Sequence, residues 1–232
     1  MDNYYNKYIK YKNKYLELKK HSENKNETNE ELNYKSILKK KYPDCVFDKT
    51  TLKNADEYLK NGYATTYGEM DYEAIEKFNS FYNKLGKFKT FIDFGSGRGK
   101  LPIFMALYVD KSIGIELVTE RHNDAIKLKQ EMSLSFPNIA KKVELLNIDM
   151  FKFLETINTF DSPVMVWISN LCFGDIITTK LFNVLVKKLP PQSIIGSSKL
   201  PSELPNGIKL INKLQVKMSW SENSDIYISE IN

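Results

Sequence analysis

The chain has 232 residues, of which 42% are hydrophobic, and a formal net charge of +5 at pH 7. That is enough apolar material for one substantial core, and no apolar run approaches the roughly 18 residues of a membrane span. Cysteine and histidine are scarce, and their positions form neither a metal-ligand spacing nor a recognisable catalytic triad: Cys45, Cys172, His21 and His122. We therefore expect an intracellular protein with reduced, buried thiols, no metal and no histidine-based hydrolysis.

The first 45 residues form a basic arm that holds eleven lysines and seven acidic residues, and so carries four of the five net positive charges. Aromatic and apolar residues recur in it at helical spacing, among lysines: Tyr4, Tyr8, Tyr11, Tyr15 and Leu18. The pattern predicts a helix that packs on the body, self-associates, or binds nucleic acid or another partner. The polar run 21–33 predicts a flexible linker. The aromatic-plus-lysine opening also resembles N-termini common in giant DNA virus proteins.

Residues 46–232 are expected to form the main domain. Short helices are predicted at 33–41 and 54–61, and another begins near Tyr72. From residue 89 onward apolar runs alternate with amphipathic segments, which favours a mostly parallel sheet covered on both faces. Strands are predicted at 89–94, 111–116, 142–147, 163–169 and 193–198, and helices at 98–109, 118–134, 149–157 and 175–188. Two longer strands, 208–218 and 225–231, complete a Rossmann-like α/β sheet of seven strands.

The most informative segment is residues 91–99, Phe-Ile-Asp-Phe-Gly-Ser-Gly-Arg-Gly, at the end of the first predicted strand. A strand that breaks into a glycine-rich turn and feeds a helix lets backbone N–H groups approach a ligand closely. The third glycine is Gly99, one residue earlier than in the dinucleotide fingerprint. Glu116 ends the next strand, where a carboxylate can bind two ribose hydroxyls. These features predict a nucleoside-cofactor site, and the alternative is a tight glycine turn without a ligand.

The Asp-x-Gly-x-Gly-x-Gly motif resembles the first motif of class I S-adenosylmethionine methyltransferases. Four further segments occur in the order and spacing of one family within that class. They are Tyr67-Gly68-Glu69, Asn170-Leu171-Cys172-Phe173-Gly174, Ser197-Ser198-Lys199, and Ser219-Trp220 with Tyr227. Together they resemble the non-SET histone lysine methyltransferases of the disruptor-of-telomeric-silencing type. The resemblance covers roughly residues 55–232 and implies the seven-stranded class I methyltransferase sheet, here with an N-terminal helical extension.

The resemblance also implies residue roles. Residues that would bind S-adenosylmethionine are Tyr67, Gly68, Glu69, Asp93, Gly95, Ser96, Gly97, Gly99, Glu116, Asp149, Met150 and Asn170. Residues that would form the reaction centre and the lysine channel are Tyr67, Trp167, Ser169, Asn170, Phe173 and Tyr227. Aromatic residues also serve as ordinary core, and we expect Tyr67 and Tyr227 in the channel and Trp167 partly in the core.

The implied function is transfer of a methyl group from S-adenosylmethionine to a lysine of a nucleosomal core histone, with histone H3 as the expected target. The partners would be nucleosomes or histones, with DNA bound by the N-terminal lysines. If the source is viral, the location would be the host nucleus or a viral factory. Two alternatives stay open: a class I methyltransferase acting on a non-histone protein lysine or on nucleic acid, and a non-catalytic binding module. Two residues depart from the pattern that is usual in the family. Ser169 replaces an asparagine, and Lys100 replaces a glutamine or asparagine.

Overall fold

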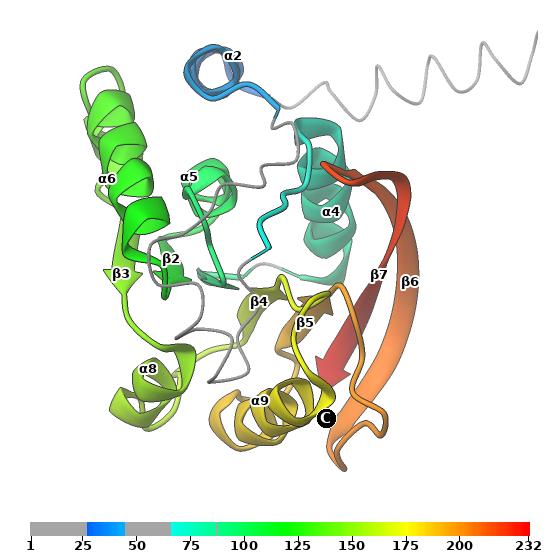
Figure 1. Cartoon of the computed structure of the whole chain (residues 1–232). Coiled ribbons are helices and arrows are strands. Elements are labelled where there is room, and N and C mark those ends of the chain that lie inside the picture. The colour runs from blue at the N-terminus through cyan, green and yellow to red at the C-terminus, as the bar shows by residue number, and fades with distance from the viewer. Residues whose placement is uncertain (1–26, 45–65, 87) are drawn as a thin grey trace, which may run out of the picture. The chain divides into compact units, whose positions relative to one another are not determined.

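The structure is a computed structural model of the chain that describes residues 27–44, 66–86 and 88–232 (Figure 1). Contacts divide the chain into two units, Met1–Ile37 and Leu38–Asn232, and the second contains the whole sheet. The predicted helical stripe at 4–18, the predicted helix at 54–61 and the expected domain boundary after residue 45 lie outside the described residues.

Helix α2, Asn29–Lys41, begins four residues before the predicted helix start. Thr28 and Glu31 cap it reciprocally. The Thr28 N–H donates to the Glu31 carboxylate at 2.7 Å, and the Glu31 N–H donates to the Thr28 hydroxyl at 3.2 Å. The prediction of a flexible linker through Asn33 is therefore wrong for residues 29–33, because a polar composition there conceals a capping box.

Seven strands form one sheet in the order β3-β2-β1-β4-β5-β7-β6, which confirms the predicted α/β class. Strands β1 to β5 run parallel, and β7 enters antiparallel between β5 and β6. The strands are β1 Thr90–Phe94, β2 Lys111–Glu116, β3 Val143–Asn147, β4 Val164–Ile168, β5 Ile194–Ser197, β6 Ile208–Met218 and β7 Ser221–Ile231. Since β1 is flanked by β2 on one side and β4 on the other, the carboxyl ends of β1 and β4 form the switch point where such sheets bind ligands.

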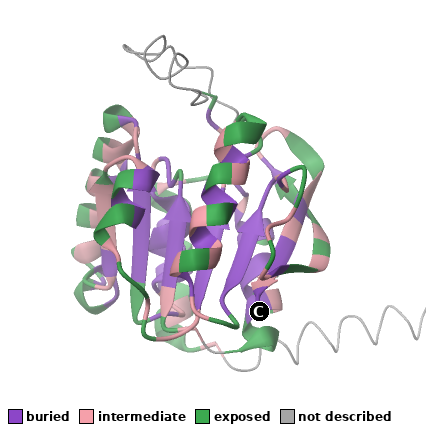
Figure 2. Ribbon diagram, turned by 90° about the horizontal axis from the view of Figure 1, so that it is seen from below, coloured by how far each residue is buried: buried purple, intermediate pink, exposed green. Residues whose placement is uncertain are grey.

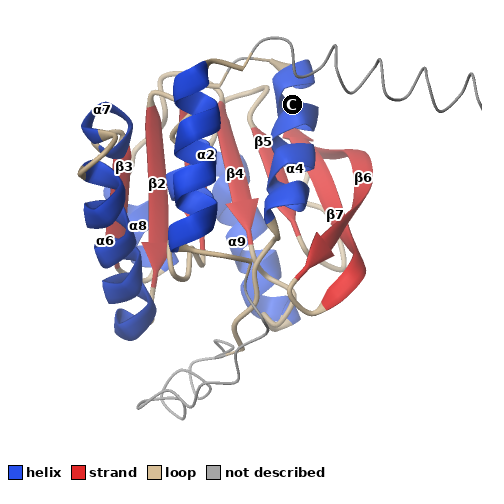
Figure 3. Ribbon diagram, turned by 90° about the horizontal axis from the view of Figure 1, so that it is seen from above, coloured by secondary structure: helices blue, strands red, loops and turns tan. Residues whose placement is uncertain are grey.

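Helices cover both faces of the sheet (Figures 1 and 3). Those on one face are α4 Tyr72–Leu85, α5 Lys100–Met105 and α6 Thr119–Ser133, and those on the other are α8 Met150–Thr156 and α9 Asp175–Lys188. A short helix, α7 Pro137–Ala140, follows α6 and was not predicted. Helix α5 is shorter than the predicted 98–109. It begins only at Lys100, because Gly97 and Gly99 hold positive φ angles of 55° and 80° before it, and it ends at Met105.

Successive side chains of β1 and β4 point to opposite faces of the sheet, and nearly all of them are buried, so the centre of the sheet is covered on both faces (Figure 2). Ile92 and Phe94 of β1 join the apolar cluster under α8 and α9. Trp167 of β4 points to the opposite face, where its ring meets Phe78 of α4 edge-on at 5.3 Å. Asp93 is the register partner of Trp167, which places a carboxyl group inside the α4 side of the core. None of the helices in the described ranges is long and apolar enough to cross a membrane.

Candidate active site

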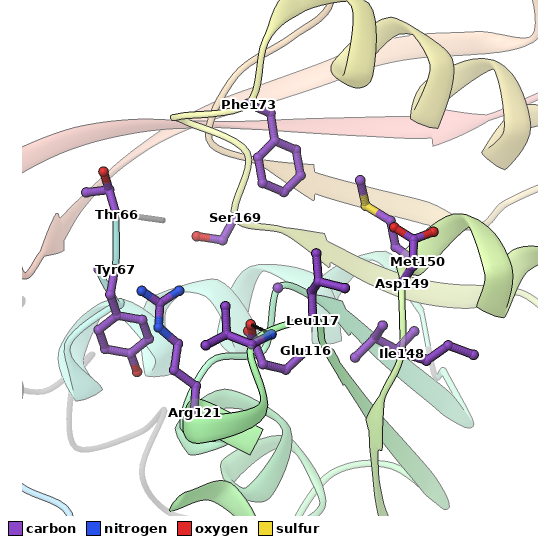
Figure 4. Close-up of a pocket in the computed structure, with 14 residues that line it drawn as sticks. Thr66, Tyr67, Glu116, Leu117, Arg121, Ile148, Asp149, Met150, Ser169 and Phe173 are labelled. Carbon is purple, nitrogen blue, oxygen red and sulfur yellow. Dashed lines mark hydrogen bonds between the residues drawn. The ribbon is translucent and has the colours of Figure 1, made fainter. Parts of the chain in front are cut away.

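A pocket opens at the carboxyl ends of β1, β2 and β4 (Figure 4). Its walls come from five separate parts of the chain. They are residues 66–68 before α4, Gly95 after β1, residues 115–118 with Arg121 at the start of α6, residues 148–150 at the start of α8, and Ser169 with Phe173 after β4. The parallel strand order is what brings these loops to one edge.

Glu116 is the buried acid of this pocket, with only 5% of its surface exposed. Its carboxylate accepts the N–H of Gly97 at 2.7 Å and the N–H of Val118 at 2.8 Å, which fixes it between the glycine turn and α6. Burial raises the pKa of Glu116, while these backbone donors and the nearby charge of Arg121 oppose the rise. The result is an oriented carboxylate at the place where the sequence predicts ribose recognition.

The Tyr-Gly-Glu segment fits tightly between the glycine turn and the β6–β7 turn. A Cβ at Gly97 would lie 2.3 Å from the Tyr67 ring, and one at Gly68 would lie 2.2 Å from the Trp220 ring. Ser219 pairs with Glu69 twice: its hydroxyl accepts the Glu69 N–H at 3.0 Å, and its own N–H donates to the Glu69 carbonyl at 2.8 Å. Both glycines are therefore required by close approach of an aromatic ring.

Glu69 lies at the centre of a buried polar network. One carboxylate oxygen accepts the hydroxyls of Tyr67 and Tyr42, the latter at 2.5 Å. The other forms an ion pair at 2.7 Å with Lys100, and the two side chains are 8% and 3% exposed. Asp44 lies 3.4 Å from the same ammonium. Burial first, and then the charge of Glu69, raise the pKa of Tyr67 well above its usual range, so its phenol stays protonated.

Asp93 lines a smaller cavity that adjoins the first pocket and shares Tyr67 and Gly95 with it. It is 2% exposed, and its Oδ1 receives no hydrogen bond from any described residue. Burial, followed by the negative charges of Glu116 and Glu69, raises the pKa of this carboxyl well above its usual range. A buried acid of this kind is suited to a cationic ligand group, which would hold it ionised.

A third cavity adjoins the first pocket and shares lining residues with it, among them Tyr67, Ser169 and Phe173. Its lining is largely apolar and aromatic: Thr66, Tyr67, Gly68, Ser169, Leu171, Cys172, Phe173 and Trp220. Cys172 is exposed, which corrects the expectation of a buried thiol there, since the residue lies on the loop after β4 and not in a strand.

The loop after β4 is fixed to the loop after β5. Asn170 is fully buried, and its amide donates to the Lys199 carbonyl at 2.8 Å and accepts the Lys199 N–H at 3.0 Å. The Lys199 ammonium in turn donates to the Phe173 carbonyl at 2.9 Å and pairs with Asp175 at 2.8 Å. The Ser-Ser-Lys turn therefore fixes the backbone at Phe173, a residue that lines both the first pocket and the third cavity.

The structure separates the residues of the sequence-based site prediction into three groups. Those that line the first pocket are Tyr67, Gly68, Gly95, Glu116, Asp149, Met150, Ser169 and Phe173. Those that line the smaller cavity, apart from residues already named, are Glu69, Asp93, Ser96 and Trp167. Those that are not among the described lining residues of these three cavities are Gly97, Gly99, Asn170 and Tyr227. Tyr227 lies opposite Ser197 in the sheet, with the Lys213 ammonium 5.6 Å from its ring centroid.

Sequence reasoning missed several lining residues, notably Thr66, Ile148 and Arg121. Arg121 lies five residues beyond Glu116 in the first turn of α6, and no motif marks it. Asp149 has a structural role in addition to its place in the pocket, since its Oδ1 accepts two N–H groups at the start of α8. Within the described residues, no group of three or more His, Cys, Asp or Glu side chains is placed to hold a metal ion.

The family model "Histone methylation protein DOT1" matches residues 42–224 of this chain. Several solved methyltransferases resemble its fold. A putative O-methyltransferase from Klebsiella pneumoniae aligns with a TM-score of 0.55 and 12% identity, over 85% of this chain and 95% of that one. An O-methyltransferase from Bacillus cereus in complex with SAH gives 0.55 and 11%, over 79% and 93%.

Magnesium protoporphyrin IX methyltransferase from Synechocystis PCC 6803, with bound SAM, aligns with a TM-score of 0.52 and 11% identity, over 87% of this chain and 91% of that one. At such low identities these likenesses show the fold and leave the substrate open. No match to this chain was found among curated protein sequences.

Proposed function

This chain belongs to the DOT1 family of histone methylation proteins, and we propose that it transfers a methyl group from S-adenosylmethionine to a lysine of a nucleosomal histone, with histone H3 as the expected target. The observation that carries this proposal is the adjacency of two cavities. The pocket over Glu116 and the aromatic cavity are both lined by Tyr67, Ser169 and Phe173. Because the cavities adjoin, ligands bound in them would meet end to end, as a displacement at a methyl carbon requires.

The first pocket has the groups that S-adenosylmethionine needs. Glu116 is buried and oriented for the ribose hydroxyls, and Ile148 with Met150 offers an apolar wall for the adenine. The methionine moiety would then extend towards Asp93, whose unpartnered Oδ1 suits an ammonium group. When bound, the cofactor supplies a methyl group activated by its sulfonium. Glu69 is already engaged by Lys100 and two tyrosines, which leaves Asp93 as the better acid for that ammonium.

The second cavity suits the aliphatic stem and amine of a lysine. Tyr67, Phe173 and Trp220 surround it with aromatic faces, which attract a cation and exclude water. A water-poor site also lowers the pKa of an entering ammonium, and only the neutral amine can attack. The Tyr67 hydroxyl donates a hydrogen bond to Glu69 and its pKa is raised, so it stays protonated and does not act as the base. We infer that the lysine loses its proton to solvent, and that these side chains position the neutral amine.

The alternative acceptors differ in shape and charge from a lysine. Methyltransferases that act on base amines often carry Asn/Asp-Pro-Pro-aromatic after the fourth strand, and the corresponding residues here are Asn170-Leu171-Cys172-Phe173, without either proline. Asn170 is also turned away to Lys199 and is not presented to an acceptor. Both observations favour a protein lysine over a base.

The proposal is tested by transfer of radiolabelled methyl from S-adenosylmethionine to intact nucleosomes, free histones, naked DNA and bulk RNA. We expect label on a histone lysine, strongest in nucleosomes, and located by peptide mass spectrometry. Glu116→Ala is the matched control, because loss of its charge-assisted hydrogen bonds should weaken cofactor binding by roughly 1.5–3 kcal/mol per bond. Label on nucleic acid, or equal label on histones with the control variant, would contradict the proposal.

A further inference from the structure

Arg121 lies in a pocket whose other charged lining residues, among those the structure describes, are both acidic: Glu116 and Asp149. Of the described residues that line the first pocket, Arg121 alone carries a positive charge. Its guanidinium carbon lies 4.9 Å from the centroid of the Tyr67 ring. Figure 4 shows the group beside that ring, at the end of the pocket away from Asp149 and Met150. The proposed function and the sequence motifs leave this residue without a role.

The direction of the cofactor decides what Arg121 would meet, and this step rests on the proposed function. With the ribose at Glu116 and the adenine at Met150, the amino-acid end of the cofactor extends towards Tyr67 and Gly95. That end is a zwitterion, with one ammonium and one carboxylate. Asp93 offers an anion for the ammonium, and the carboxylate requires a cationic or N–H donor of its own.

We propose that Arg121 binds the α-carboxylate of the cofactor's methionine moiety. A guanidinium presents parallel N–H donors that match a carboxylate in a bidentate arrangement. The contact of the guanidinium with the face of the Tyr67 ring restricts its side chain before a ligand binds, so that less conformational freedom remains to be lost on binding.

Arg98 provides a matched comparison within the same chain. Its guanidinium carbon lies 5.3 Å from the same Tyr67 ring, and its side chain pairs with Asp124 at 3.5 Å. Arg98 is not among the described lining residues of the first pocket. Substitution of Arg98 therefore removes a cation close to the Tyr67 ring but does not remove a residue that lines the first pocket.

The test compares the Kd of S-adenosylmethionine with that of decarboxylated S-adenosylmethionine, by calorimetry, for the wild type, Arg121→Gln and Arg98→Gln. The wild type should prefer the intact cofactor by about tenfold to a hundredfold, the value of one charge-assisted hydrogen bond. Arg121→Gln should bind both ligands nearly equally, whereas Arg98→Gln should keep the wild-type preference.

A wild-type preference retained in Arg121→Gln would overturn this assignment while leaving the proposed function intact. Failure of the wild type to bind either ligand would instead overturn the proposed function, and this inference with it. Because Arg121 is only half-buried, both variants should fold, and their melting temperatures verify this. Arg121→Lys adds a graded comparison, since it keeps the charge and loses the planar fork, and it should retain only part of the preference.

Discussion

Asp93 is a buried acid whose ionisation is unfavourable in the ligand-free protein. Its carboxyl is buried beside two other acids, and its pKa is raised well above the usual range. In the folded protein it therefore holds a proton over a pH range in which the unfolded chain has released it. Stability falls as pH rises from the unfolded-state pKa through the folded-state pKa. At neutral pH an ionised Asp93 would thus destabilise the ligand-free protein.

We predict that Asp93→Asn raises the melting temperature of the ligand-free protein at pH 7 and weakens binding of S-adenosylmethionine. The stability gain should shrink as pH falls towards 4, because the wild-type carboxyl is then protonated in the folded state and increasingly protonated in the unfolded state. Thermal unfolding from pH 4 to pH 8 measures the first effect, and calorimetry the second. A variant less stable than the wild type at pH 7 would show that Asp93 has a stabilising partner in the ligand-free protein.

Lys100 is a buried cation whose counter-charge is Glu69. We predict that Lys100→Met lowers the free energy of unfolding by about 3–5 kcal/mol, since it leaves a carboxylate buried without its ion pair. Adding Glu69→Gln should recover much of the loss, as both charges are then absent. Lys39→Met is the control. Its partner is Glu76, both side chains are more than two-fifths exposed, and the expected change is below about 1 kcal/mol. Urea unfolding distinguishes these outcomes, and equal losses for the two variants would contradict the prediction.

At the scale of elements, the loops after β4 and β5 act as one unit because Asn170 joins them. Asn170→Asp replaces a donor to the Lys199 carbonyl with an acceptor, and we predict a loss of about 1–3 kcal/mol in unfolding free energy. Asn183→Asp on the exposed side of α9 removes a comparable side-chain bond, to the Thr179 carbonyl, and should have little effect. If Asn170→Asp were as stable as the wild type and lost only cofactor affinity, Asn170 would be a ligand-binding residue.

The strands could be predicted from sequence because each is an apolar run bounded by turn residues, and buried parallel strands carry just that signal. Helix boundaries were harder. The start of α2 depends on a capping box within a polar run. Helix α5 begins directly after Gly99, whose left-handed conformation is not helical. Both errors arise where a local hydrogen bond or φ angle, and not hydrophobic periodicity, sets the boundary.

The glycine turn and Glu116 could be placed in the site because short motifs mark them. Arg121 could not, since its role depends on a helix turning its first residues towards a ring that lies 54 positions earlier in the chain. Asn170 shows the opposite limit. Its motif is recognisable, but the direction of its side chain follows from the position of Lys199, which only the fold determines.

At the scale of the whole molecule, the positive charge is concentrated at the N-terminus. Residues 1–26 hold seven lysines and three acidic residues. We predict that deleting residues 1–26, which leaves the Thr28–Glu31 cap in place, preserves folding and cofactor affinity but weakens nucleosome binding. The loss should be greatest at low salt, and the salt dependence of affinity should become shallower, because phosphate contacts release counterions. Equal nucleosome affinity with and without residues 1–26 across a salt series would show that these residues do not contribute to nucleosome binding.

The most direct measurement is a crystal structure of the complex with S-adenosylhomocysteine. The ribose hydroxyls should lie on Glu116, the adenine beside Met150, and the sulfur should face the aromatic cavity formed with Phe173 and Trp220. That orientation would direct a methyl group at an amine entering the cavity. A nucleoside bound outside this pocket, or a sulfur facing away from the aromatic cavity, would contradict methyl transfer between the two adjoining cavities.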